Sequence, residues 1–187
     1  MNKISIALAI ALIIISGILG YMLGYSRTGE YRAQMFNKTP MDLGNAGKLF
    51  DLRYLNAMIS HHTVAILLAE QARNHSDRKE IKELAQKILA DEPIAIKELY
   101  EFKLQWFKDK RLIQNPPIVN LGPADEKFDL RFLNALITHH EEGLLMTKET
   151  MLKTTRTETL NNANAVDSFL KSTLKILQDW RKEWYGI

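Results

Sequence analysis

The chain has 187 residues, enough for one domain of ordinary size and a short appendage. Its 25 basic and 22 acidic residues give a formal net charge of +3 and are mixed along the sequence, without the basic stripe of a nucleic-acid-binding protein. Cysteine is absent, which excludes disulfides, thiolate metal sites and cysteine nucleophiles, so any soft metal ligand must be methionine.

The first predicted element is an apolar segment over residues 4–25, preceded by a short flank at residues 1–3. It carries no charge and is long enough to cross a bilayer as a helix. No clear small-residue cleavage site follows it, which favours a membrane anchor or an uncleaved signal over a cleaved signal peptide. Positive charges lie on both sides of the segment, so they barely discriminate its orientation. We expect a single-pass protein of the cell membrane with its folded part outside the cytoplasm.

Two polar segments with helix breakers divide the remainder of the chain. Residues 26–48 show no apolar period and predict a polar stalk. Residues 114–127 contain two adjacent prolines and a Gly-Pro pair, which a continuous helix cannot accommodate, so they predict a linker. The folded domain is therefore expected over residues 49–187, with one half at 49–113 and the other at 128–187.

The two halves are an internal repeat. FDLRYLNAMISHH at Phe50 aligns with FDLRFLNALITHH at Phe128, and the same offset of 78 residues brings Trp106 onto Trp184. Turn signals at RNHSD in the first half and KTTRTET in the second predict a helical hairpin in each. Two hairpins predict an all-α, ferritin-like four-helix bundle that follows the membrane helix.

Both histidine pairs lie on helix faces that the apolar period predicts to be buried. In the first repeat, a spacing of three and four residues places His62 on a stripe with Ile59, and His61 on a neighbouring stripe with Met58. A buried imidazole without a partner costs roughly 1–3 kcal/mol, so two matched pairs need a reason. Clustered histidines favour a metal site, and a core hydrogen-bond network that responds to pH is the alternative. The candidate ligands are His61, His62, His139, His140 and Met58.

Other polar residues near these helices have predicted supporting roles. Glu92 is the single charged member of an apolar stripe on the second predicted helix, and Leu170 takes its place in the second repeat. We expect Glu92 to orient an imidazole or to form a buried ion pair, with direct ligation as the alternative. Met146 lies about two turns after the second histidine pair, which favours core packing over a role at the metal. Asp51 and Asp129 lie farther away and are predicted to be helix N-caps.

The histidine pairs, together with LAQKILADEPIAIKELYEFKLQW from Leu84, resemble the domain of unknown function 305 (DUF305) family over about residues 50–184. This resemblance implies a ferritin-like four-helix bundle outside the cytoplasm, which in some members binds copper or silver through histidine and methionine. The matching residues are Met58, His61, His62, His139 and His140.

Several positions depart from the family pattern and predict an altered metal site. Leu136 replaces the methionine of the second motif, and Ala95 and Leu99 replace a glutamate and a methionine of the later helix. Glu92 stands where the family has glutamine. The second repeat departs further, with Leu170, Thr173 and Leu177 at those positions.

We therefore expect a membrane-tethered, extracytoplasmic metal-binding protein that is not an enzyme and acts in copper homeostasis. Imidazole and thioether donors favour Cu(I), with zinc or Cu(II) as alternatives where a carboxylate joins. The alternative function is a structural or interaction bundle that binds no metal. A di-iron enzyme is disfavoured because its Glu-x-x-His pairs do not occur in the chain. The predicted partners are the membrane and a metal ion, and the sequence names neither a metal-transfer partner nor an oligomeric state.

Overall fold

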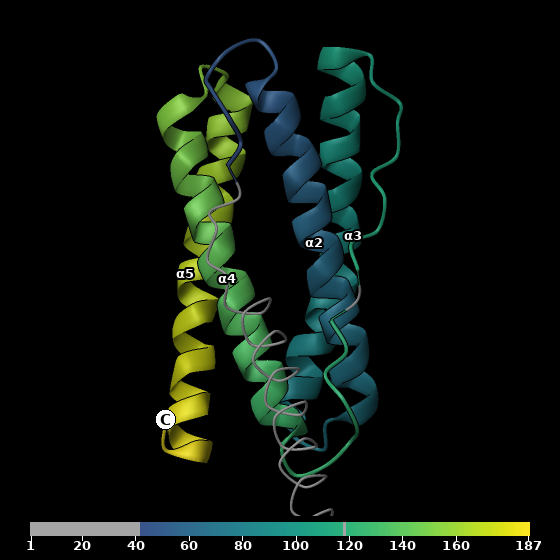
Figure 1. The fold of residues 1–187 in the computed structure, drawn as a ribbon, viewed down its shortest axis with the longest axis vertical. Helices are drawn as coiled ribbons and strands as arrows, with labels where there is room; N and C mark the ends of the chain where they lie inside the picture. The colour runs from purple at the N-terminus through teal and green to yellow at the C-terminus, as the bar shows by residue number, and fades with distance from the viewer. Residues whose placement is uncertain (1–41, 118) are drawn as a thin grey trace, which may run out of the picture. The chain divides into compact units, whose positions relative to one another are not determined.

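A computed structural model describes residues 42–117 and 119–187, and these residues form four α-helices and no strand (Figure 1). The helices are α2 (Phe50–His75), α3 (Lys79–Phe107), α4 (Phe128–Lys153) and α5 (Thr157–Tyr185). The predicted all-α class and the two hairpin turns are therefore confirmed. The predicted membrane helix at residues 4–25 lies outside the described residues. None of the four helices is both long and apolar enough to cross a membrane.

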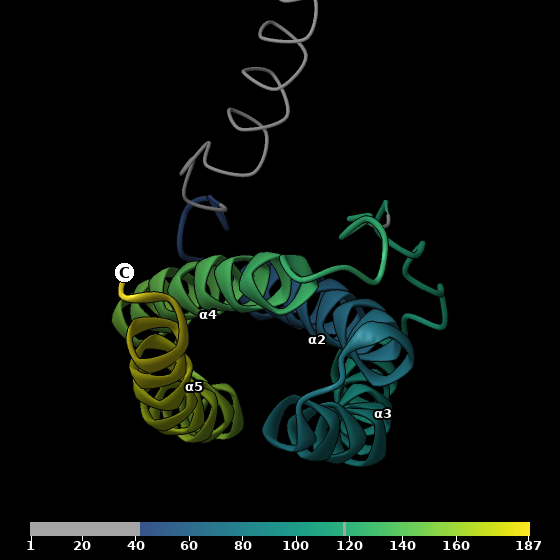
Figure 2. The same cartoon turned by 90° about the horizontal axis from the view of Figure 1, so that it is seen from below.

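Two central helices and two flanking helices make up the bundle. α2 and α4 lie side by side, α3 packs against α2, and α5 packs against α4. Seen end-on, the helices follow an arc in the order α5, α4, α2, α3, so that the flanking helices face each other (Figure 2). α2 and α4 run in opposite directions, and residues 108–117 and 119–127 return along the bundle from α3 to α4 (Figure 1). One long crossover of this kind also occurs in ferritin-like bundles.

Two clusters of buried apolar side chains stabilise the bundle, one on each side of the histidine pairs. One cluster surrounds Phe132 and Leu133 and joins the last turns of α2 to the start of α4. The other surrounds Phe50 and Tyr54 at the opposite end. Tyr54 keeps its hydroxyl satisfied in this apolar setting by donating a hydrogen bond of 2.7 Å to Asn162 on α5. Each large side chain buried in this way stabilises the fold by roughly 1.5–3 kcal/mol.

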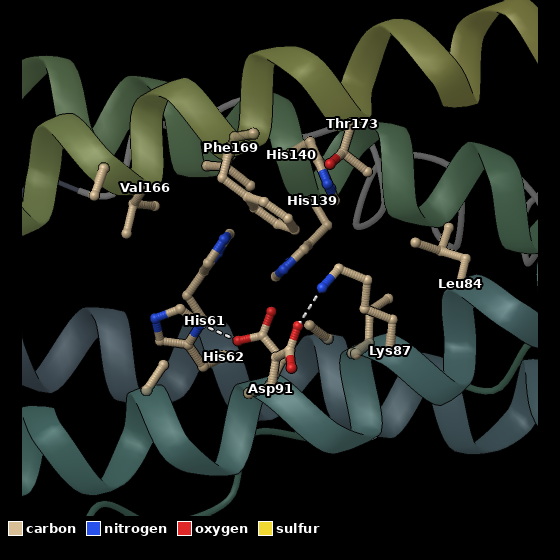
Figure 3. Close-up of a pocket in the computed structure, with 16 residues that line it drawn as sticks. His61, His62, Leu84, Lys87, Asp91, His139, His140, Val166, Phe169 and Thr173 are labelled. Atoms are coloured by element: carbon tan, nitrogen blue, oxygen red, sulfur yellow. Dashed lines mark hydrogen bonds and ion pairs between the residues drawn. The ribbon is translucent and has the colours of Figure 1, made fainter.

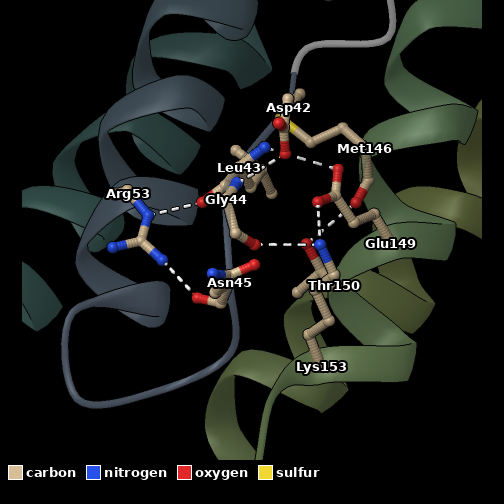
Figure 4. Close-up of polar contacts among 9 residues, drawn as sticks. All are labelled: Asp42, Leu43, Gly44, Asn45, Arg53, Met146, Glu149, Thr150 and Lys153. Carbon is tan, nitrogen blue, oxygen red and sulfur yellow. Dashed lines mark hydrogen bonds and ion pairs between the residues drawn. The ribbon is translucent and has the colours of Figure 1, made fainter.

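The segment before the first helix of each repeat is folded in the same way, so the repeat begins upstream of residues 49 and 128. Arg53 donates a hydrogen bond to the carbonyl of Leu43 (Figure 4), and 78 positions later Arg131 donates one to the carbonyl of Leu121. The glycine after each leucine has a positive φ, 76° in the first repeat and 84° in the second, which glycine adopts without strain.

The segment before α2 also contacts α4. Leu43 is buried, and its amide lies 3.5 Å from the carboxylate of Glu149 (Figure 4). Lys153 donates a hydrogen bond of 2.9 Å to the carbonyl of Gly44. Residues 42–48, which form the end of the predicted stalk, therefore lie against the helical domain.

Asp51 and Asp129 are not the helix N-caps that the sequence predicted. In both helices the capping position falls two residues earlier, and the residue there makes no side-chain capping hydrogen bond. Asp51 instead lies 3.7 Å from Arg156, and Asp129 lies 3.5 Å from Arg78. The aspartates thus connect the start of each repeat to the hairpin turn of the other repeat.

The same two arginines stack on tryptophan rings of the opposite repeat. The guanidinium carbon of Arg156 lies 4.3 Å from the ring centre of Trp106, and that of Arg78 lies 4.2 Å from the ring centre of Trp184. The two contacts join α3 and α5 near opposite ends of the bundle. We call them the Arg–Trp clasps.

We expect Arg156→Ala to lower the free energy of unfolding by about 1 kcal/mol, because it removes a partly exposed cation–π contact and an ion pair. Arg156→Lys should recover only part of this loss, since lysine keeps the charge but lacks the planar face. Urea denaturation followed by circular dichroism measures both. The effects of Arg78→Ala and Arg156→Ala should add, because the clasps lie far apart. Unchanged stability in both single variants would show that the Arg–Trp clasps do not stabilise the fold.

Candidate metal centre

A pocket of about 370 Å³ lies between the four helices at the level of the histidine pairs (Figure 3). α2 and α4 contribute the four histidines. α3 contributes most of the other polar groups, Lys87, Asp91 and Glu92, and α5 contributes mainly apolar side chains such as Val166 and Phe169. The predicted histidines of both repeats therefore meet at one site.

All four imidazoles are nearly buried, with exposed fractions between 4% and 8%. His61 and His139 occupy matching positions in the two repeats. Their rings stack face to face, with centres 3.7 Å apart and planes inclined by 12°. Two imidazolium cations could not approach so closely in a buried setting, so this contact requires at least one neutral ring.

The hydrogen bond of His140 determines which of its nitrogens can bind a metal. Its Nδ1 lies 2.9 Å from the carbonyl oxygen of Leu136, one turn earlier in α4, so Nδ1 carries the proton and donates. The lone pair then resides on Nε2, which is buried and has no hydrogen-bond partner in the part of the chain that the structure describes. A neutral imidazole with a free Nε2 is the form that ligates metal ions.

His62 has a carboxylate partner where His140 has a backbone partner. Its Nδ1 hydrogen-bonds with Glu92, and its Nε2 is likewise buried without a partner. A carboxylate in this position orients a ligating imidazole and raises its basicity. Leu170 occupies the matching position on α5, so His140 has no carboxylate to bind. α3 continues as a helix through Pro93 and so keeps Glu92 in place.

The structure does not bring Met58 to the imidazoles. Met58 and Met146 are both buried in the apolar cluster around Phe50 and Tyr54 and do not line the pocket. Met58 lies about one turn before the histidine pair on α2, but its side chain packs in the apolar cluster instead of lining the pocket. Met146 occupies the core position that the sequence favoured.

The side chains as they stand do not yet enclose an ion. Within residues 42–117 and 119–187, no group of three histidine, aspartate or glutamate side chains is close enough to hold a metal. Binding would therefore require some imidazoles to turn about their side-chain bonds.

Sequence reasoning missed the residues at the mouth of the pocket. Lys87 and Asp91 form an exposed ion pair of 2.6 Å one helical turn apart on α3, and Phe169 faces them from α5 with 42% of its surface exposed. The spacing of the ion pair was visible in the sequence. It did not reveal that this pair lies beside the histidines, because that depends on how α3 is rotated.

Burial lowers the pKa of three of the imidazoles. Desolvation, followed by repulsion from the neighbouring imidazoles, holds the pKa of His61 well below its usual value. The same causes lower the pKa of His139 to about 3. Desolvation lowers the pKa of His140 to about 4, although its bond to Leu136 and the nearby Glu92 carboxylate oppose the shift. These rings are therefore neutral near pH 7, as metal binding requires.

We expect the free energy of unfolding of the metal-free protein to fall as the pH falls from about 6.5 toward 4. The folded-state pKa values lie below those of the unfolded chain, so the unfolded chain binds more protons in this window. Each such imidazole contributes up to about 1.4 kcal/mol per pH unit. Urea denaturation at a series of pH values measures the slope. His139→Phe keeps an aromatic ring that cannot titrate and should flatten the curve, whereas an equal slope in both proteins would refute this origin.

Comparison with known proteins relates this chain to one family model and to solved structures of CopM. The model of the family described as domain of unknown function (DUF305) matches residues 26–116. CopM in the apo form is 29% identical with a TM-score of 0.65, and the match covers 73% of this chain and 98% of that chain. CopM in the Cu(I)-bound form is 28% identical over the same shares, also with a TM-score of 0.65. CopM in the Cu(II)-bound form is 26% identical with a TM-score of 0.63, covering 72% and 97%. No curated protein matches this chain.

Proposed function

Because residues 26–116 belong to the DUF305 family, as the sequence resemblance predicted, we propose that this protein binds copper in the histidine-lined pocket and acts in copper homeostasis. Solved structures of CopM with Cu(I), Cu(II) and silver bound support copper as the metal. One observation carries the proposal. The Nε2 atoms of His61, His62 and His140 are buried and have no hydrogen-bond partner among residues 42–117 and 119–187.

The surroundings of these nitrogens suit metal ligation better than a hydrogen-bond network in the core. In a network, each ring nitrogen would pair with a carboxylate, a hydroxyl or another imidazole. Among the described residues, the imidazoles make one bond to a carboxylate and one to a backbone carbonyl, both through Nδ1. Leaving each Nε2 unpaired costs roughly 1–3 kcal/mol, and a bound ion would offset that cost. This comparison favours metal binding over the purely structural alternative.

His62 and His140 are the proposed principal ligands, because their Nδ1 bonds leave the lone pair on Nε2. Glu92 would hold the ring of His62 and strengthen it as a donor. His61 would join from the position that it occupies against α4, and His139 would join once its ring turns out of the stack. Imidazoles with a nearby carboxylate suit Cu(II) as well as Cu(I), so the proposed ligand is copper in either state. The preference for Cu(I) expected from Met58 would require its thioether to turn into the pocket.

We also propose that the protein is not an enzyme and that residues 4–25 tether it to the cell membrane with the bundle outside the cytoplasm. The carboxylates that line the pocket, Asp91 and Glu92, both come from α3. A di-iron enzyme of the ferritin-like kind needs carboxylates from all four helices. The uncharged segment at residues 4–25 supports the tether.

Titration of the full chain in detergent with Cu(I), Cu(II) and Zn(II) against a competing chelator tests the proposal. We expect the His61→Ala/His62→Ala variant to bind copper roughly 10–100-fold more weakly than the wild type, because two donors are lost. His75→Ala is the matched control, since His75 is an exposed histidine of the same helix. Equal affinity in all three proteins would exclude the pocket as the copper site. Met58→Leu should leave the affinities unchanged, because Met58 does not line the pocket.

We expect Glu92→Leu, which copies the matching residue of the second repeat, to lower copper affinity roughly 10-fold or more. The variant removes the group that orients His62, and it should leave the fold intact because leucine is accepted at the matching position. Glu92→Gln should lose less affinity, since its side-chain oxygen still accepts a hydrogen bond from Nδ1. The exposed Glu98 of α3 provides the control variant Glu98→Gln. Wild-type affinity in Glu92→Leu would show that His62 does not depend on this carboxylate.

A further inference from the structure

We infer that Gly143 is a positioning residue of the site, because its missing side chain leaves the space in which the imidazole of His61 lies. The inference rests on the proposed function only where it concerns copper. The packing of the ring against α4 stands independently of what the pocket binds.

The space beside Gly143 is too small for any side chain while His61 is in place. A β-carbon built on Gly143 would lie 2.7 Å from Nε2 and 2.8 Å from Cε1 of His61, and 2.6 Å from a terminal methyl of Leu170. Non-bonded carbon atoms are in optimal contact at about 3.5–4.0 Å. The Leu170 methyl is the end of a flexible side chain and can move aside. The imidazole would have to give up its position.

A second residue of the same helix also restrains the ring of His61. His139 lies one turn before Gly143 on α4, and its ring stacks on that of His61 with centres 3.7 Å apart. Residues four apart on a helix share a face, so the ring of His139 and the bare backbone of Gly143 form two walls of one niche. His61 is only 7% exposed, so its imidazole has little room to retreat toward solvent.

The two repeats differ at this point. Ala65 of α2 stands where the second repeat has Gly143. The space that admits His61 on α4 is therefore not repeated on α2, where it would admit His139. Glycine is unfavourable in the interior of a helix, where alanine is the best residue. Its presence in the middle of α4 therefore has a physical reason in the ring that it admits. Gly143 makes the first-repeat histidine the one that reaches across to the opposite hairpin.

A double-mutant cycle in the metal-free full chain tests the packing. We expect Gly143→Ala to destabilise the wild-type protein but to be neutral or stabilising when His61 is alanine, because the clash disappears and the helix preference for alanine remains. Ala65→Gly is the matched control and should have the same effect in both backgrounds. An equal effect of Gly143→Ala in both backgrounds would overturn the inference. If Gly143→Ala alone does not fold, the double variant must fold, and failure of both would also overturn it.

Copper binding tests the consequence for the site. We expect Gly143→Ala to weaken copper binding roughly 10-fold, as loss of a supporting residue does, and to remove one imidazole nitrogen from the electron paramagnetic resonance spectrum of the Cu(II) form. Ala65→Gly should change neither. Wild-type affinity with an unchanged nitrogen pattern in Gly143→Ala would overturn the positioning role. Failure of the wild type to bind copper would instead overturn the proposed function and the role of Gly143 in it. The double-mutant cycle in the metal-free protein would still test the packing of His61 against Gly143.

Discussion

The stacked contact between His61 and His139 lies where the two hairpins of this protein meet, and the proposed metal site is built around it. It joins equivalent residues of the two repeats at the point where α2 and α4 lie side by side, between two apolar clusters. Burial lowers the pKa of both rings, so the contact is maintained by neutral imidazoles. With these rings at the centre, the neighbouring His62 and His140 point their unpaired Nε2 atoms into buried space, and α3 and α5 complete a pocket around all four.

Two equivalent histidine pairs have acquired unequal surroundings. In the first repeat, His62 hydrogen-bonds with the carboxylate of Glu92. In the second repeat, Leu170 stands at the matching position, and His140 bonds to a backbone carbonyl instead. The second repeat supplies Gly143 in place of Ala65. Each half therefore supports a histidine of the first pair. The first repeat holds His62 by a hydrogen bond, and the second repeat leaves space for His61 beside Gly143. The pair at His61 and His62 is the better supported of the two, in agreement with the stronger family resemblance of the first repeat.

The sequence predicted most of the fold because two independent patterns agreed. The apolar period located the helices, and the offset of 78 residues located their equivalents, so the hairpins, the turns and the burial of the four histidines followed. Asp51 and Asp129 were misassigned because capping preference is local, whereas their partners are arginines of the other repeat. Spacing placed Met58 on the histidine face but could not show that its side chain packs in the apolar cluster beside the pocket. The glycine at position 143 was visible, but the ring that fills its space lies 82 residues away in the sequence.

The Arg–Trp clasps have a consequence for how the chain folds. Each arginine belongs to the hairpin turn of one repeat and stacks on a tryptophan at the far end of the other. A single repeat would therefore expose both an unpaired arginine and a bare tryptophan face, along with the apolar side of its central helix. Although the sequence looks like two copies of one module, we expect neither copy to fold by itself. The contacts between the halves favour one cooperative domain in which the pair is the smallest stable form.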